Sequence, residues 1–129
     1  MSVARPRPLV VAADDEPDAL ELVRLSLTRA GMDVMTARDG ADALTLILSE
    51  GPDICVLDVG MPHLSGFELT RMVRHDPRTA GIPVMLLTAA ARVTDEAEGL
   101  AAGADAYLTK PFSPTALVTR VRELIAEPV

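Results

Sequence analysis

The 129-residue sequence contains one cysteine, one tyrosine, two phenylalanines and no tryptophan. The single cysteine, Cys55, excludes an internal disulfide, and its place in the apolar run 54–57 indicates a small buried side chain. No apolar run approaches the roughly 18 residues that span a bilayer, and no segment resembles a signal peptide. We therefore expect a soluble, cytoplasmic protein with no membrane partner.

Positive charge is also scarce. Twelve basic residues stand against 19 acidic ones, which gives a net charge of −7. This balance would repel a phosphate backbone and argues against direct nucleic-acid binding, while it suits a cation or a partner with basic patches. Lys110 is the only lysine among the basic residues, so this position requires a specific explanation.

Five apolar runs of four or five residues alternate with segments of helical periodicity. The runs are 9–13, 33–36, 54–57, 83–87 and 106–109. Their length is typical of strands, and the first, third and fourth are apolar throughout, as in parallel strands covered on both faces. Repeated strand–helix units with right-handed crossovers predict a doubly wound α/β sheet.

Capping residues divide the chain at the same places. Gly31 follows the first helical segment as a C-cap glycine, and Asp39 precedes the second. Ser65 and Glu68 have capping-box spacing for a third helix that ends near 75–77, and Ser113 with the following proline begins the last helix. One domain is predicted after a flexible N-terminal arm at residues 1–7.

Polar residues follow four of the predicted strands. They are Asp14, Asp15 and Glu16 after the first run, Asp58 after the third, Thr88 after the fourth, and Lys110 with Pro111 after the fifth. Ligands of doubly wound sheets bind at the carboxyl ends of the strands, so we expect these residues to converge. Clustered carboxylates need a cation, and ligands that are all oxygens favour Mg²⁺ over zinc.

A magnesium ion, a lysine and a hydroxyl together would stabilise a phosphoryl group, and Asp58 is placed to be its nucleophile. Each residue also has a simpler interpretation. The acids 14–16 could start a helix, Asp58 could start a turn, Thr88 could end a strand, and Lys110 could be a solvated surface lysine. Their joint position at one sheet edge favours the phosphoryl site.

Five motifs, taken in order, resemble the receiver domain of two-component response regulators. They lie at residues 11–17, 52–62, 65–69, 87–89 and 103–112. The resemblance assigns residues 8–127 to a receiver domain, with no output domain visible. It implies a flavodoxin-like, five-stranded parallel sheet of order 2-1-3-4-5 with five flanking helices.

The resemblance implies that Asp58 is the phosphoacceptor for a sensor histidine kinase or a phosphotransfer protein. Asp14 and Asp15 would hold Mg²⁺ together with Asp58 and the backbone carbonyl of Gly60. The chain would then be a signalling switch and not an enzyme, with phosphotransfer and autodephosphorylation as its only chemistry. Its output would pass through a downstream protein or through a missing output domain.

Thr88 and Lys110 would contact phosphoryl oxygens, and the bond between Lys110 and Pro111 would be cis. Phosphorylation would draw Thr88 inward and turn the ring of Tyr107, which remodels the surface of the fourth helix, fifth strand and fifth helix. The expected fourth helix, 94–100, is acidic where receivers of winged-helix transcription factors usually place basic residues. We therefore expect a monomer or a weak dimer.

Two other functions use similar residues. A phosphatase of the haloacid dehalogenase type also has an aspartate nucleophile, but it normally needs a second carboxylate two residues later, where this chain has Gly60. An adaptor that never receives phosphate would not need the complete set of three aspartates, a threonine and a lysine.

Overall fold

The structure is a computed structural model that describes residues 5–89 and 100–126. Its elements are β1 (Leu9–Ala13), α1 (Pro17–Arg29), β2 (Asp33–Ala37), α2 (Gly40–Glu50), β3 (Ile54–Asp58), α3 (Gly66–His75), β4 (Val84–Ala89), β5 (Ala106–Lys110) and α5 (Pro114–Ile125). The helix expected at 94–100 lies outside the described residues except for Leu100, which is helical. Within the described ranges, no helix is both long and apolar enough to cross a bilayer.

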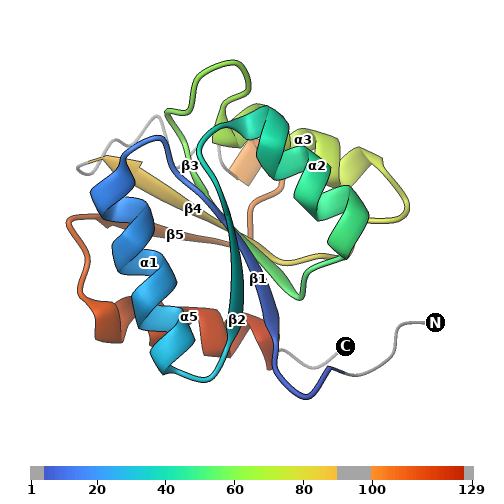
Figure 1. Cartoon of the computed structure of the whole chain (residues 1–129). Helices are drawn as coiled ribbons and strands as arrows, with labels where there is room; N and C mark the ends of the chain where they lie inside the picture. Colours follow the sequence, from blue (N-terminus) through green and yellow to red (C-terminus); the bar gives the residue numbers. More distant parts are fainter. Residues whose placement is uncertain (1–4, 90–99, 127–129) are drawn as a thin grey trace.

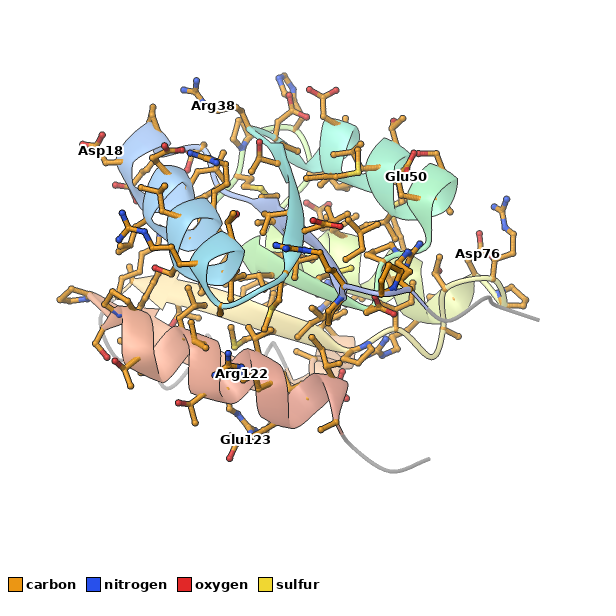
Figure 2. The ribbon with its side chains drawn as sticks, turned by 60° about the horizontal axis from the view of Figure 1, so that its bottom comes forward. Asp18, Arg38, Glu50, Asp76, Arg122 and Glu123 are labelled. Atoms are coloured by element: carbon orange, nitrogen blue, oxygen red, sulfur yellow. The ribbon has the colours of Figure 1, made fainter. Side chains whose placement is uncertain are left out.

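The five strands form one parallel sheet in the order β2-β1-β3-β4-β5, which confirms the predicted topology. Helices α1 and α5 pack on one face and α2 and α3 on the other (Figure 1). Charged side chains project outward from these layers, as Asp18, Glu50 and Glu123 do in Figure 2.

Each face of the sheet has its own hydrophobic core. Val11 and Ala13 of β1 pack toward α2 and α3, whereas Val10 and Ala12 pack toward α1 and α5. Because both faces are covered, all residues of β1 and β3 are buried, which explains their continuous apolar sequence. The edge strand β2 is largely open to solvent and has a more polar sequence.

The predicted helix starts are confirmed. The Ser65 hydroxyl accepts from the backbone N–H of Glu68, whose carboxylate accepts in return from the Ser65 N–H, so the capping box is complete. Asp39 and Ser113 likewise accept from backbone N–H groups at the starts of α2 and α5. These local contacts fix where each helix begins after its strand.

Four strands end beyond their apolar runs, β2 by one residue at Ala37 and three others at or next to predicted site residues. Asp58 is the last residue of β3, Lys110 is the last residue of β5, and β4 runs from Val84 to Ala89. The extension follows from pairing between strands, since Asp58 lies opposite Leu87 and Lys110 opposite Ala89. Asp58 and Lys110 therefore lie on strand ends, where pairing with the neighbouring strand fixes their backbone positions.

Candidate functional site

The carboxyl edge of the sheet brings together residues from three strands. Asp14 follows β1, Asp58 ends β3, and Lys110 ends β5. The Lys110 Nζ lies 2.8 Å from Asp14 Oδ2, 3.0 Å from Asp58 Oδ1 and 3.0 Å from Glu16 Oε1. The only lysine of the chain thus lies among three carboxylates, and it is not a solvated surface residue.

Three aspartates form a compact oxygen cluster. One carboxylate oxygen from each of Asp14, Asp15 and Asp58 lies within 4.8 Å of the others. Asp14 is fully buried and Asp58 is 7% exposed, whereas Asp15 faces solvent. All the donors are oxygens, which is the set that Mg²⁺ prefers.

Hydrogen bonds orient two of these carboxylates. Asp14 Oδ1 accepts from the Glu16 N–H at 3.0 Å, and Asp58 Oδ2 accepts from the Gly60 N–H at 3.1 Å. Within the described residues, the buried Asp14 Oδ2 has no hydrogen-bond donor, because the nearby Lys110 ammonium pairs with it by charge but outside hydrogen-bond geometry. A buried carboxylate oxygen left in this state fits a metal ligand.

The electrostatics of the cluster are unbalanced toward negative charge. Burial raises the pKa of Asp58, and the neighbouring Asp14 adds to this effect, although Lys110 and the Gly60 N–H act in the opposite direction. Burial acts to lower the pKa of Lys110, but its contacts with the carboxylates of Asp14, Asp58 and Glu16 outweigh this and raise it. Lys110 is therefore firmly charged, whereas burial makes the ionised form of Asp58 less favourable than it would be in water.

A pocket of about 340 Å³ opens onto the cluster. It is lined by Asp15, Glu16, Asp58, Val59, Gly60, Ala89 and Lys110. A second pocket of about 410 Å³ shares Glu16, Ala89 and Lys110 with the first and extends between α1 and the start of the β5–α5 connection. The acid cluster is thus reachable from solvent and adjoins a more apolar groove.

The remaining predicted site residues lie at the same edge or behind it. Thr88 is 3% exposed and lies on β4 beside Ala89, which lines the pocket. Among the described side chains, Thr88 and Asp58 form no hydrogen bond with each other. Tyr107 is partly buried on β5 and packs against the core beneath α2 and α3. The Lys110–Pro111 peptide bond is cis.

Glu16 is the residue of this site that the sequence interpretation left without a role. It follows two aspartates in the sequence, but its carboxylate contacts Lys110 and is not part of the aspartate cluster. The available signal was its position directly after two aspartates at the end of the first strand. Spacing in the sequence does not show which distant residue a side chain can contact, so it does not identify Lys110 as the partner of Glu16.

Comparison with known proteins identifies the family. The profile of the response regulator receiver domain matches residues 10–122. The chain belongs to this family. A Synechocystis relative, the DNA-binding dual master transcriptional regulator RpaA, is 41% identical over 118 residues, which cover 92% of this chain and 49% of the relative. The chain spans about half the length of the curated relatives it matches.

Solved structures agree with the receiver fold. A structure from Chloroflexus aurantiacus superposes with a TM-score of 0.91 at 36% identity, covering 94% of this chain and 99% of the other. The chemotaxis response regulator CheY4 of Vibrio cholerae gives a TM-score of 0.87 at 33% identity, with 92% and 98% covered. The flavodoxin-like fold predicted from the sequence is confirmed.

Proposed function

We propose that this receiver takes a phosphoryl group onto Asp58 from a phosphohistidine of a sensor histidine kinase or a phosphotransfer protein. One observation carries the proposal. Asp58, at the end of the central strand, lines an accessible pocket with the Lys110 ammonium 3.0 Å from its Oδ1 and two further aspartates within 4.8 Å. This arrangement pairs a carboxylate nucleophile with a fixed cation.

In the proposed transfer, a carboxylate oxygen of Asp58 attacks phosphorus and the bond between phosphorus and the histidine nitrogen breaks. The electron pair leaves with that nitrogen, and Asp58 becomes an acyl phosphate. Lys110 pairs with one phosphoryl oxygen, and the Thr88 hydroxyl donates to another. Both groups stabilise negative charge where it develops, which lowers the barrier.

Mg²⁺ would be held by Asp14, Asp15, Asp58 and the backbone carbonyl of Gly60. The buried Asp14 Oδ2 without a hydrogen-bond donor and the oxygen-only cluster support this assignment. When bound, the ion supplies positive charge to the phosphoryl oxygens and offsets the mutual repulsion of the carboxylates. Lys110 remains the cation that the chain itself provides.

In this proposal, phosphorylation switches the protein between two conformations and does not convert a substrate repeatedly. Phosphorylation draws Thr88 toward Asp58 and lets the Tyr107 ring turn, which alters the surface expected from the fourth helix (94–100), β5 and α5. That surface acts on a downstream protein or on an output domain of a longer chain. We propose a cytoplasmic monomer or weak dimer whose net charge of −7 disfavours direct contact with nucleic acid.

Mass spectrometry after incubation with Mg²⁺ and acetyl phosphate tests the proposal. We expect one phosphoryl adduct on the wild-type protein, none on Asp58→Asn, and none after chelation of Mg²⁺. Asp18→Asn is the matched control, because Asp18 is an exposed acid on α1 outside both pockets. An adduct that persists on Asp58→Asn contradicts the acceptor, and sustained phosphate release from phosphomonoesters would favour the phosphatase.

A further inference from the structure

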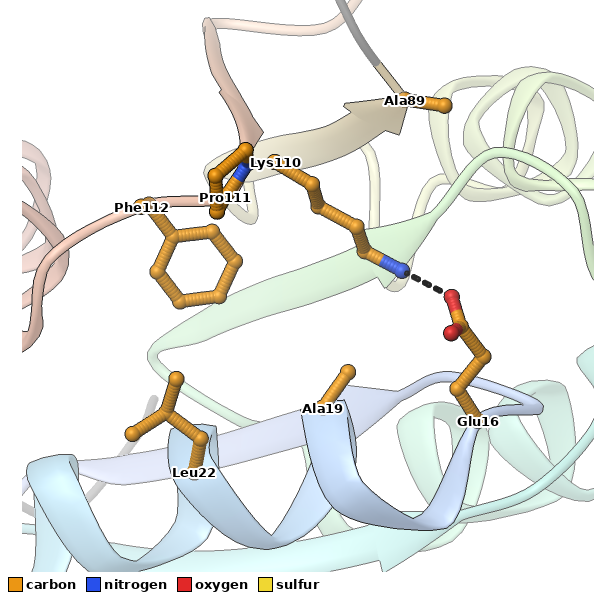
Figure 3. Close-up of a pocket in the computed structure, with 7 residues that line it drawn as sticks. All are labelled: Glu16, Ala19, Leu22, Ala89, Lys110, Pro111 and Phe112. Carbon is orange, nitrogen blue, oxygen red and sulfur yellow. Dashed lines mark hydrogen bonds and ion pairs between the residues drawn. The ribbon is translucent and has the colours of Figure 1, made fainter.

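Lys110 contacts Glu16, a residue to which the proposed phosphotransfer assigns no role. Of the three ion pairs that Lys110 makes with described residues, the one to Glu16 also meets hydrogen-bond geometry, at 3.0 Å. Figure 3 shows the lysine reaching from the end of β5 toward the glutamate at the start of α1. The directed hydrogen bond of the lysine is therefore made to a residue outside the aspartate cluster.

Among the described residues, the Glu16 carboxylate has no polar partner besides Lys110. Glu16 occupies the N-cap position of α1, yet its side chain makes no capping hydrogen bond. Its backbone is engaged at both groups, since the N–H donates to Asp14 Oδ1 and the carbonyl accepts from the Leu20 N–H. The carboxylate is therefore not used to start α1, and in the described part of the chain its polar contact is with Lys110.

Exposure ranks the three ion pairs of Lys110 by how readily they break. The side chains of Asp14 and Asp58 are 1% and 10% exposed, whereas that of Glu16 is 66% exposed. An exposed ion pair contributes little because water screens it and because ordering long side chains costs entropy. The pair with Glu16 is therefore the first to give way when another anion approaches Lys110.

The ion pair also lies where the two pockets meet. Glu16 and Lys110 line both the pocket at Asp58 and the groove that extends along α1. On the groove side, the Phe112 ring lies over Ala19 and Leu22 (Figure 3). An incoming phosphoryl group therefore meets this pair beside the Asp58 pocket.

We propose that Glu16 is a positioning residue that acts as a latch, holding Lys110 in the unphosphorylated protein and releasing it to the phosphoryl group. This inference rests on the proposed phosphorylation of Asp58. The ammonium has three N–H donors, and the one directed at Glu16 becomes available for a phosphoryl oxygen. Glu16 therefore competes with the phosphoryl group for Lys110 and repels anionic donors at the pocket mouth.

Rates of adduct formation with acetyl phosphate and Mg²⁺ test the latch. We expect Glu16→Gln to react about threefold faster than Asp18→Asn at low salt, the size typical of losing one exposed ion pair. Asp18→Asn removes the same charge from the same helix turn without touching Lys110, so it controls for net charge. The advantage of Glu16→Gln should shrink as salt rises.

A second readout does not depend on phosphorylation. Because Lys110 is the only lysine, its side-chain ammonium gives a single ¹⁵N resonance in NMR spectra. In protein without donor, we expect Glu16→Gln to shift or broaden this resonance through faster hydrogen exchange, and Asp18→Asn to leave it in place. A merely structural role of Glu16 at the start of α1 would not move this signal.

The two proposals fail in different ways. If the wild-type protein forms no adduct, the proposed function is wrong, while the NMR comparison still reports on the latch. If the wild type forms an adduct but Glu16→Gln reacts at the rate of Asp18→Asn or more slowly, the latch is wrong. An unchanged ammonium resonance in Glu16→Gln overturns it as well.

Discussion

At the amino ends of the strands each of three acids has its own arginine, whereas at the carboxyl ends three acids share one lysine. The amino-edge pairs are Arg7–Asp33 at 3.1 Å, Arg5–Asp53 at 3.3 Å and Arg74–Asp105 at 2.6 Å. At the other edge, Lys110 faces the carboxylates of Asp14, Glu16 and Asp58. Positive and negative charges are therefore matched one to one in the pairs at the amino edge, whereas acids outnumber the base in the group at the carboxyl edge.

Two amino-edge acids also complete the sheet. Asp53 Oδ2 accepts from the Leu9 N–H at 2.7 Å, and Asp105 Oδ2 accepts from the Val84 N–H at 2.8 Å, so each satisfies the first N–H of a neighbouring strand. Asp14 Oδ2, by contrast, is buried and pairs with Lys110, but it accepts no hydrogen bond from the described residues. An acid at a strand end is therefore structural when its hydrogen-bond partners are complete, and it is available for chemistry when they are not.

The largest effect is expected from breaking the amino edge at Arg74. Its guanidinium donates to the carbonyls of Gly103, Ala80 and Ile82 and to Asp105, joining the end of α3 to the starts of β4 and β5. We expect Arg74→Ala to lower the free energy of unfolding by about 3 kcal/mol, because several partly buried acceptors lose a charged donor. Urea denaturation measures this loss.

Arg78→Ala is the matched control, since Arg78 pairs with Asp76 at the surface and its side chain is 72% exposed. Its cost should stay below about 1 kcal/mol. Arg74→Ala should still form the phosphoryl adduct at a temperature where it is folded. Equal losses from the two substitutions, or loss of the adduct in folded Arg74→Ala, would contradict the division between a structural edge and a chemical one.

A smaller effect of opposite sign is expected at the carboxyl edge. Burial raises the pKa of Asp58, so the folded state binds a proton more readily than the unfolded state. The contribution of Asp58 to stability should therefore fall as pH rises from the ordinary aspartate range of about 4 through this raised pKa. Asp58→Asn removes that slope and, without Mg²⁺ at neutral pH, should stabilise the fold by about 1 kcal/mol, a value reduced by water near the carboxylate.

Urea midpoints between about pH 4 and pH 7, in chelator, give the measurement. Asp18→Asn should keep the wild-type slope, because Asp18 lies outside the cluster. Adding Mg²⁺ should stabilise the wild type more than Asp58→Asn, since binding to the folded state alone raises its stability. If Asp58→Asn proves less stable than the wild type at neutral pH, the carboxyl edge carries no excess of charge.

Much of the fold followed from the sequence because its signals are local. The capping box at Ser65 and Glu68 depends on residues three apart, and the continuous apolar runs follow from burial on both faces. The gathering of Asp14, Asp58 and Lys110 followed from topology, since parallel strands place their carboxyl ends at one edge. The roles of these residues in phosphotransfer stay predictions.

Contacts between side chains that are far apart in the chain could not be predicted from the sequence. The Glu16–Lys110 hydrogen bond joins residues 94 positions apart, and the Arg74–Asp105 pair joins residues 31 apart. Strand ends were also misplaced by one or two residues at Asp58 and Ala89, because pairing with a neighbour and not local composition sets them. The acidic helix expected at 94–100 lies almost wholly outside the described residues.

The smallest predicted effect concerns the backbone. Where φ is positive near the amino edge the chain has glycine, as at Gly31, whereas His63, between β3 and α3 at the carboxyl edge, adopts φ 69° with a side chain. The left-handed conformation costs a residue with a Cβ roughly 1–2 kcal/mol. Glycine avoids this cost but loses more freedom on folding, so His63→Gly should stabilise the fold by only about 0.5 kcal/mol.

Gly31→Ala supplies the reverse test for this strain. A Cβ at Gly31 meets no atom within 4 Å, so any loss of stability there, expected near 1 kcal/mol, comes from φ alone. Urea midpoints of both variants measure the pair. One outcome would be that Gly31→Ala lowers stability while His63→Gly leaves it unchanged. In that case the loop after β3 holds His63 without backbone strain. The two edges then differ in charge and not in backbone geometry.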